Sequence, residues 1–371
     1  RDAHAGKNFQ TFAPDLEKVV NLTREKAEIS SQRLRCAPYD ALLDEHDPGR
    51  TSAEVDRLFT EIRQVLPGLV QKAIERQSGR EPLAFPGYIP LSKQKKLAKI
   101  IMRKIGFPFD QGRLDESKHP FTEGPPGDVR ITSRYNKKDL LTGLMGVLHE
   151  TGHALYDFGL PRQWINQPVG RDLGMTVHES QALFLEMMIG RSREFMTFVA
   201  PLMTETLGVS GKEWEPENLY QQATRVRRSF IRVDADEVTY LEHIAIRYEL
   251  EKDLFSGTLR VKDLPDAWNA KMREGLGITP ADDSEGCLQD SHWAHGYFGY
   301  FSTYALGLLM AAQLRQSMIQ HNLEITASIS QGNFAPVVGW LRQNVHNMGG
   351  KVSTHEMLKN ATGKTLSFEP F

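Results

Sequence analysis

Cysteine is scarce in this chain, which also lacks a long hydrophobic run and an excess of one charge. The two cysteines, Cys36 and Cys287, offer no disulfide framework, so a reducing cytoplasm is the simpler expectation. The most apolar stretch, residues 304–314, is too short to span a bilayer. A formal net charge of −2, with 25% charged residues, gives no electrostatic reason to expect binding to nucleic acid or to an anionic membrane.

Helical periodicity is what the sequence has in abundance. Apolar residues recur at helical spacing between interruptions rich in proline and glycine, which predicts a mainly α-helical protein. The expected helices are residues 9–34, 52–77, 92–105, 138–158, 176–193, 217–237, 239–256, 264–276, 299–321 and 333–345. Residues 128–135 differ, because apolar and polar side chains alternate there. This alternation predicts a strand, and an extended peptide can add to such an edge.

The most informative motif is His149-Glu150-Thr151-Gly152-His153, inside the expected helix 138–158. Two histidines four residues apart leave one face of a helix and can bind the same tetrahedral metal ion. Glu150 flanks such an ion and can take a proton from its bound water. The alternative is a surface helix with two solvated histidines. Apolar neighbours such as Leu148 and Leu155 disfavour it, because the histidines would then be buried without partners.

A catalytic zinc site needs a third protein ligand, and Glu179 is the candidate. It lies in the first turn of the expected helix 176–193, which can pack beside the first helix. Two histidines and one glutamate leave a position open for water, and cobalt fits such a site about as well as zinc. Alone, Glu179 would only indicate an acidic residue that stabilises a helix N-terminus. We expect His178 to support a ligand or face a loop, and Glu186 to be an ordinary helix carboxylate.

The chain resembles the carboxypeptidase Taq family, zinc metallopeptidases that remove C-terminal amino acids. The resemblance rests on motifs spread over most of the chain and is far more specific than the zinc motif alone. These motifs are His119-Pro120-Phe121, Asp128-Val129-Arg130-Ile131-Thr132, His149-Glu150-Thr151-Gly152-His153, His178-Glu179-Ser180-Gln181, Ile231-Arg232-Val233-Asp234-Ala235-Asp236, Gly286-Cys287-Leu288-Gln289-Asp290-Ser291-His292-Trp293 and Gly299-Tyr300-Phe301. Ser302 departs from the pattern, because we expect proline there in the family.

The resemblance implies a nearly all-helical fold with a deep active-site groove, a small β-sheet lining it, and a homodimer. It implies His149, His153 and Glu179 as metal ligands and Glu150 as general base. Its substrates would be peptides with a free C-terminus. The family is longer at the N-terminus, so we expect a helical segment to be missing upstream.

We expect residues 1–371 to form a single catalytic region. Within it, residues 1–110 would supply N-terminal helices, and residues 111–371 would carry the groove and the zinc site.

A carboxypeptidase must also bind a free terminal carboxylate, and arginine does so best through a bidentate fork. Arg232 and Arg130 are the candidates, since both lie within motifs. The alternative for either is a structural salt bridge, because aspartates lie nearby in sequence. These aspartates are Asp128, Asp234 and Asp236.

For the oxyanion of peptide hydrolysis, His292 and Tyr300 are the candidate donors, with Tyr304 as the alternate. Core packing is the competing interpretation for both tyrosines. We further expect Asp290 or Asp236 to orient a ligand histidine.

Two other functions remain open at this point. One is a helical zinc oligopeptidase that cuts internally or releases dipeptides. The other is a truncated scaffold that binds peptides without cleaving them.

Overall fold

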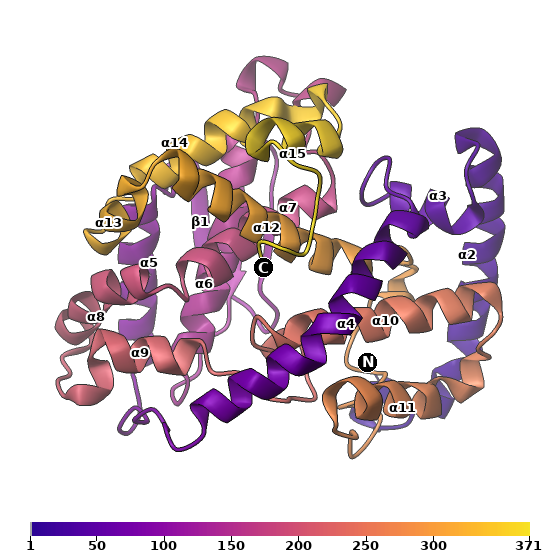
Figure 1. The fold of residues 1–371 in the computed structure, drawn as a ribbon, viewed down its shortest axis with the longest axis horizontal. Helices are drawn as coiled ribbons and strands as arrows, with labels where there is room; N and C mark the ends of the chain where they lie inside the picture. Colours follow the sequence, from indigo (N-terminus) through magenta and orange to yellow (C-terminus); the bar gives the residue numbers. More distant parts are fainter. Residues whose placement is uncertain (1) are drawn as a thin grey trace. The chain divides into compact units, whose positions relative to one another are not determined.

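Helices make up most of the chain in the computed structural model, which describes residues 2–371 (Figure 1). They belong to two units. The first unit consists of the chain up to Ser78 together with Val226–Ala305. The second unit consists of Gly79–Arg225 together with Leu306–Phe371. Each unit is assembled from segments that lie far apart in the sequence.

The first unit is helical throughout. It contains α1 (Asp2–Ala5), α2 (Ala13–Leu34), α3 (Pro38–Asp44), α4 (Ser52–Gln77), α10 (Thr239–Ser256) and α11 (Leu264–Leu276). Helix α10 packs against α2, α4 and α11 and is buried on nearly all sides. Its buried polar residues, among them Arg247 and Glu251, therefore need partners inside the unit.

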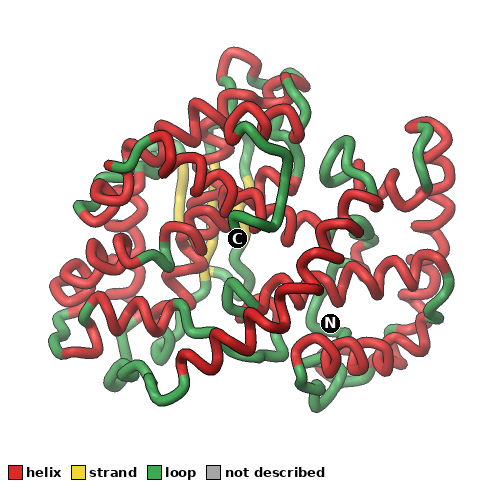
Figure 2. Tube along the Cα trace, in the orientation of Figure 1, coloured by secondary structure: helices red, strands yellow, loops and turns green. Residues whose placement is uncertain are grey.

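The second unit combines helices with a small sheet. Its elements are α5 (Leu91–Ile105), β1 (Gly112–Glu116), β2 (Phe121–Glu123), β3 (Val129–Ser133), α6 (Leu140–Gly159), α7 (Met175–Leu183), α8 (Arg193–Leu207), α9 (Pro216–Ala223), α13 (Glu324–Ser330), α14 (Ala335–Asn344) and α15 (Thr354–Thr362). Helix α12 (Phe301–His321) begins in the first unit and continues in the second. Figure 2 shows how few strands accompany the helices. The expected mainly α-helical fold with a small sheet is confirmed.

The strand expected at residues 128–135 is present as β3, but it is not an edge. The order is β1-β3-β2, with β1 parallel and β2 antiparallel to β3. Leu114 and Thr122 both pair with Ile131, so both sides of β3 are occupied. The prediction that a peptide can add to this strand is therefore wrong. The flanking strands are short and largely exposed, and they leave no clear alternation in the sequence.

Helix α6 packs on β3 on one side and on α7 on another. Val147, Ala154 and Phe158 join Val129 and Ile131 in a buried hydrophobic cluster. Burial of each larger side chain contributes about 1.5–3 kcal/mol, which fixes the helix on the sheet. The apolar residues that predicted this helix are all buried.

The expected helix 217–237 is wrong beyond α9, which ends at Ala223. The backbone then leaves the helix, and side chains take over its hydrogen bonds. The N–H of Val226 donates to Gln77, and the N–H of Arg227 donates to Asp236. Only a 3₁₀ turn, η6 (Arg232–Asp234), follows in the expected range.

No helix among residues 2–371 is both long and apolar enough to cross a membrane.

Candidate metal centre and active site

Three side chains of the second unit meet where the sequence predicts a metal site. His149 and His153 leave α6, Glu179 leaves α7, and their ligand atoms lie within 4.8 Å of one another. Oε2 of Glu179 lies 3.9 Å from Nε2 of His149 and 3.5 Å from Nε2 of His153. Among residues 2–371, no other group of His, Cys, Asp and Glu side chains has this arrangement.

The donor set fits a divalent metal ion. Nitrogen and carboxylate donors of this kind hold zinc and its neighbours among the transition metals. The Nδ1 atoms of His149 and His153 are both engaged by other side chains, so their Nε2 atoms are the ones available to an ion. Three protein ligands of this kind would leave a coordination position open, as catalytic sites require.

Two glycines let other helices approach α7 closely. A Cβ on Gly152 of α6 would lie only 2.3 Å from the carbonyl oxygen of Gln181. A Cβ on Gly307 of α12 would lie 3.0 Å from Cβ of Glu179. Helix α7 therefore packs backbone-close to α6, and this contact places Glu179 beside the two histidines.

Glu150 is buried next to His149, and a hydrogen bond from the sheet fixes its carboxylate. The hydroxyl of Thr122, on β2, donates a hydrogen bond of 2.6 Å to Oε2 of Glu150. Burial raises the pKa of Glu150, and His149 and Thr122 oppose that rise. A buried carboxylate of raised pKa suits a group that accepts and then returns a proton.

Glu186 supports His149, so the expectation that it is an ordinary helix carboxylate is wrong. After α7 the chain continues as a π-helix, η4 (Phe184–Ile189), which carries Glu186. Its Oε2 lies 2.9 Å from Nδ1 of His149, and its Oε1 accepts a hydrogen bond of 2.9 Å from Arg191. Burial raises the pKa of Glu186, but His149 and Arg191 outweigh burial and lower it. The carboxylate is therefore ionised and orients the His149 ring.

His178 supports the other histidine, which is one of the two positions expected for it. Its Nδ1 lies 2.7 Å from Nδ1 of His153, and its Nε2 lies 3.1 Å from Oδ1 of Asp157. Neither Asp157 nor Thr122 was predicted from the sequence as a supporting residue. Asp157 had a signal that was overlooked, since it continues the four-residue spacing of His149 and His153 along α6.

The two ligand histidines differ in charge when no metal ion is bound. Burial lowers the pKa of His149, but Glu179 and Glu186 outweigh burial and raise that pKa to about 10. Burial lowers the pKa of His153 well below its ordinary value, and the neighbouring His178 lowers it further. Without a metal ion, His149 is therefore protonated and positively charged, and Glu179 and Glu186 stabilise that charge.

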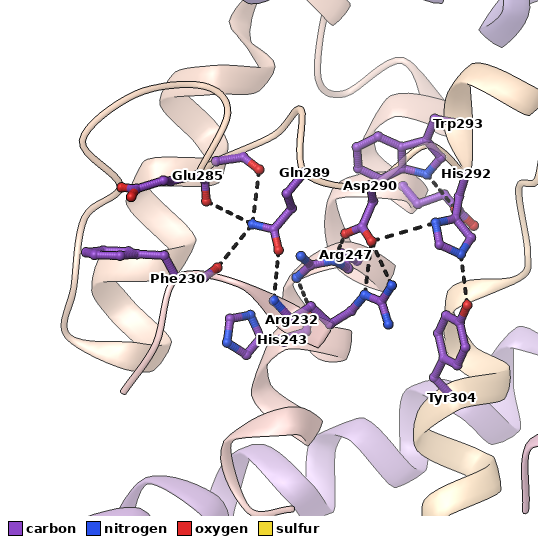
Figure 3. Close-up of polar contacts among 12 residues, drawn as sticks. Phe230, Arg232, His243, Arg247, Glu285, Gln289, Asp290, His292, Trp293 and Tyr304 are labelled. Carbon is purple, nitrogen blue, oxygen red and sulfur yellow. Dashed lines mark hydrogen bonds and ion pairs between the residues drawn. The ribbon is translucent and has the colours of Figure 1, made fainter. Parts of the chain in front are cut away.

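A second polar cluster, in the first unit, surrounds Asp290 (Figure 3). Nε and Nη2 of Arg232 donate to Oδ1 of Asp290 at 3.0 and 2.8 Å, and Nε of Arg247 donates to Oδ2 at 2.5 Å. Both guanidinium groups are buried. Burial raises the pKa of Asp290, but the two arginines outweigh burial and hold that pKa well below its usual range. Two cations share one carboxylate, so these three groups carry a surplus positive charge.

His292 lies at the edge of this cluster and contacts Tyr304. Its Nε2 is 2.9 Å from the Tyr304 hydroxyl, whereas its Nδ1 is 3.8 Å from Asp290. Burial and the two nearby arginines lower the pKa of His292 to about 3, although Asp290 opposes them. The imidazole is therefore neutral at physiological pH. Tyr300 packs its ring against His46 and His292, with centroids 5.0 and 5.4 Å apart.

Neither Asp290 nor Asp236 orients a ligand histidine, so that expectation is wrong. Asp236 instead accepts hydrogen bonds from backbone N–H groups at the start of α10, including that of Thr239. Arg130, the other candidate for carboxylate binding, is half exposed on β3. It donates two hydrogen bonds to Asp128, of 3.2 and 2.8 Å.

Comparison with known proteins identifies the family of this chain. The family model for the carboxypeptidase Taq (M32) metallopeptidases matches residues 1–371. Carboxypeptidase 1 of Bacillus subtilis is 40% identical over 367 residues, which are 99% of this chain and 73% of that protein. Thermostable carboxypeptidase 1 of Thermus thermophilus is 38% identical, over 100% of this chain and 74% of that protein.

A solved structure gives the same result. Metallocarboxypeptidase 1 of Trypanosoma cruzi superposes with a TM-score of 0.96 at 38% identity, covering 100% of this chain and 75% of its own. Such a likeness over the whole length extends beyond the metal motif to both units. The chain therefore belongs to the carboxypeptidase Taq (M32) metallopeptidase family, and it is a metallocarboxypeptidase that hydrolyses peptides.

Proposed function

We propose that this chain removes single amino acids from the C-terminus of peptides, with zinc held by His149, His153 and Glu179. The observation that carries the proposal is the convergence of these side chains beside the buried carboxylate of Glu150. Two histidines and one carboxylate are a zinc set, and cobalt is the alternative ion.

A zinc ion bound there would polarise the scissile carbonyl and supply a water of near-neutral pKa. Glu150 takes the proton from the attacking water and returns it to the leaving amine. The hydrogen bond from Thr122 occupies Oε2 of Glu150, which leaves Oε1 for the proton. Burial of Glu150 supports both transfers, because a raised pKa brings the carboxylate closer to the pKa of the groups with which it exchanges.

Arg232 is assigned to the terminal carboxylate of the substrate. Its bonds to Asp290 use Nε and Nη2 and leave Nη1 for a ligand. The surplus positive charge shared with Arg247 supports this role, because a second carboxylate would balance it. Arg130 is the alternative, and its bidentate pairing with Asp128 weakens its case.

His292 and Tyr300 are assigned to the developing oxyanion, with Tyr304 as the alternate. The neutral state of His292 supports donation of an N–H hydrogen bond rather than a full positive charge. Its contact with the Tyr304 hydroxyl is the reason to keep Tyr304 as the alternate.

We also propose that the protein is a cytoplasmic homodimer whose partners are peptides rather than nucleic acids or membranes. Residues 1–371 would act as one catalytic region with a deep groove. Sedimentation of the purified protein tests the dimer.

The decisive experiment is mass spectrometry of a short peptide incubated with the zinc-loaded protein. A ladder that loses one residue at a time from the C-terminus supports the proposal, and a C-terminally amidated copy of the peptide is the control. Internal cuts or dipeptide losses would instead favour the oligopeptidase function. An intact peptide in the presence of bound zinc would favour a scaffold that binds without cleaving.

A further inference from the structure

His153, His178 and Asp157 form a chain of polar contacts that leads away from the candidate metal ligands. His149, His153 and Asp157 follow one another at four-residue intervals, so they lie along one face of α6. His178 reaches from α7 between the last two. Its ring centroid lies 4.8 Å from that of His153, and its two nitrogens contact His153 and Asp157 at 2.7 and 3.1 Å.

The contact between the two Nδ1 atoms requires one proton between them, because two lone pairs or two N–H groups would repel. Asp157 decides which ring supplies it. A carboxylate at 3.1 Å requires an N–H on Nε2 of His178. When an ion occupies Nε2 of His153, Nδ1 of His178 must carry no proton, because it then accepts the N–H of His153. His153 must then carry its proton on Nδ1, and its Nε2 lone pair is free to bind an ion.

We propose that His178 and Asp157 are positioning residues that fix His153 in the tautomer and ring orientation competent for metal binding. The proposal rests on the metal site of the proposed function. Neither residue touches the ion, and each acts through the ring of His153.

The support of the other ligand provides a contrast. Nδ1 of His149 contacts an ionised carboxylate directly, that of Glu186, which Arg191 also holds. His153 is backed instead by an imidazole, with the carboxylate of Asp157 one ring further away. Loss of such supporting partners typically weakens metal binding about 10- to 100-fold. His178→Phe, which removes the acceptor and keeps a ring, should fall in that range.

The first test uses the unmodified zinc-loaded protein with ¹⁵N-labelled histidine. Long-range ¹H–¹⁵N spectra should show His153 protonated on Nδ1 alone and His178 protonated on Nε2 alone. A proton on Nδ1 of His178 would overturn the proposal. This readout requires no variant to fold.

The second test is competition with a chelator, which measures the zinc dissociation constant of each variant. His178→Phe should bind zinc about 10- to 100-fold more weakly. His178→Asn should recover most of that loss, because its amide oxygen can replace the Nδ1 acceptor. The matched control is His346→Gln. His346 also packs on Tyr156, but its Nε2 contacts Gln181 rather than a ligand histidine.

The outcomes separate this proposal from the proposed function. Unchanged zinc affinity in a folded His178→Phe protein overturns the positioning role and leaves the carboxypeptidase intact. Equal weakening in the His346→Gln control also overturns it, because the effect would then be general loosening of the core. Failure of the unmodified protein to bind zinc would contradict the metal site itself.

Discussion

At the scale of single residues, Glu150 is the side chain whose chemistry can be separated from metal binding. Glu150→Gln keeps the shape and the hydrogen bond from Thr122 but removes the proton acceptor. We expect kcat to fall by about 10²- to 10⁴-fold, since that is what a positioned general base contributes. Zinc content, measured by atomic absorption, should stay at the parent level. Normal turnover by the zinc-loaded variant would show that another group is the base.

Arg232→Ala tests the carboxylate anchor. The parent should prefer a peptide acid to the matching C-terminal amide, and the variant should lose that preference. The lost charge-assisted hydrogen bonds correspond to about 1.5–3 kcal/mol, or roughly a 10- to 150-fold increase in KM for the acid. Asp290 keeps Arg247 as a partner, so the cluster should remain folded.

Arg130→Ala is the matched control for that comparison. It should retain the preference for the acid, because Arg130 is already paired with Asp128. If only Arg130→Ala lost the preference for the acid, Arg130 on β3 would be the residue that binds the substrate carboxylate.

Residue spacing alone predicted that His149 and His153 lie side by side, because they share one local helix whose geometry is fixed. The supporting residues were harder to predict. Glu186 reaches His149 from a π-helical segment, and its position cannot be read from α-helical spacing. Arg247 meets Asp290 across 43 residues, a contact that no local pattern encodes.

At the scale of elements, the contact between α6 and α7 can be tested through Gly152→Ala. The added Cβ would lie 2.3 Å from the carbonyl oxygen of Gln181, so the helices must separate. We expect a loss of about 1–3 kcal/mol of stability and weaker zinc binding, because Glu179 moves with α7.

Gly146→Ala on the same helix is the control for that change. Its Cβ would meet only the Ser133 hydroxyl oxygen, at 3.7 Å. It should leave the melting temperature unchanged or raise it, since alanine favours helix over glycine by about 1 kcal/mol. Equal effects of the two variants would show that helix approach does not position Glu179.

The elements also show where local reasoning stops. Helix α6 was predicted almost to its ends, because its apolar face is a local signal. Helix α8 was missed, and it contains Pro201, a residue that normally predicts a break. The sheet order could not be predicted, because pairing of β1 and β2 with β3 depends on tertiary contacts.

At the scale of the whole molecule, Glu251 links distant parts of the first unit. It accepts hydrogen bonds from Tyr39, Trp293 and the N–H of Gly299, and it is fully buried. Burial raises its pKa to about 7 from the ordinary 4.5, although these donors oppose the rise. The folded state therefore binds the proton more tightly than the unfolded state does. The stability from this group is complete below about pH 4.5 and is lost as pH rises to about 7.

Glu251→Gln should remove this contribution, which is on the order of 3 kcal/mol across that window. The measurement is the melting temperature of the metal-free protein at pH 5 and pH 8. The parent should lose more stability between these values than the variant. Glu61→Gln, at a partly exposed position on α4, is the control and should follow the parent. A variant as pH-sensitive as the parent would mean that Glu251 stays ionised throughout.

Because His149 lies between Glu179 and Glu186, binding of a metal ion there requires release of a proton from His149. With a pKa of about 10, the empty site holds a proton that an incoming zinc ion must expel. A weakly buffered solution of apoprotein should therefore become more acidic on titration with zinc. The heat of binding should vary with the ionisation enthalpy of the buffer. Each unit of acidification should weaken apparent zinc binding about tenfold, so mild acid would favour loss of the metal and, with it, of activity.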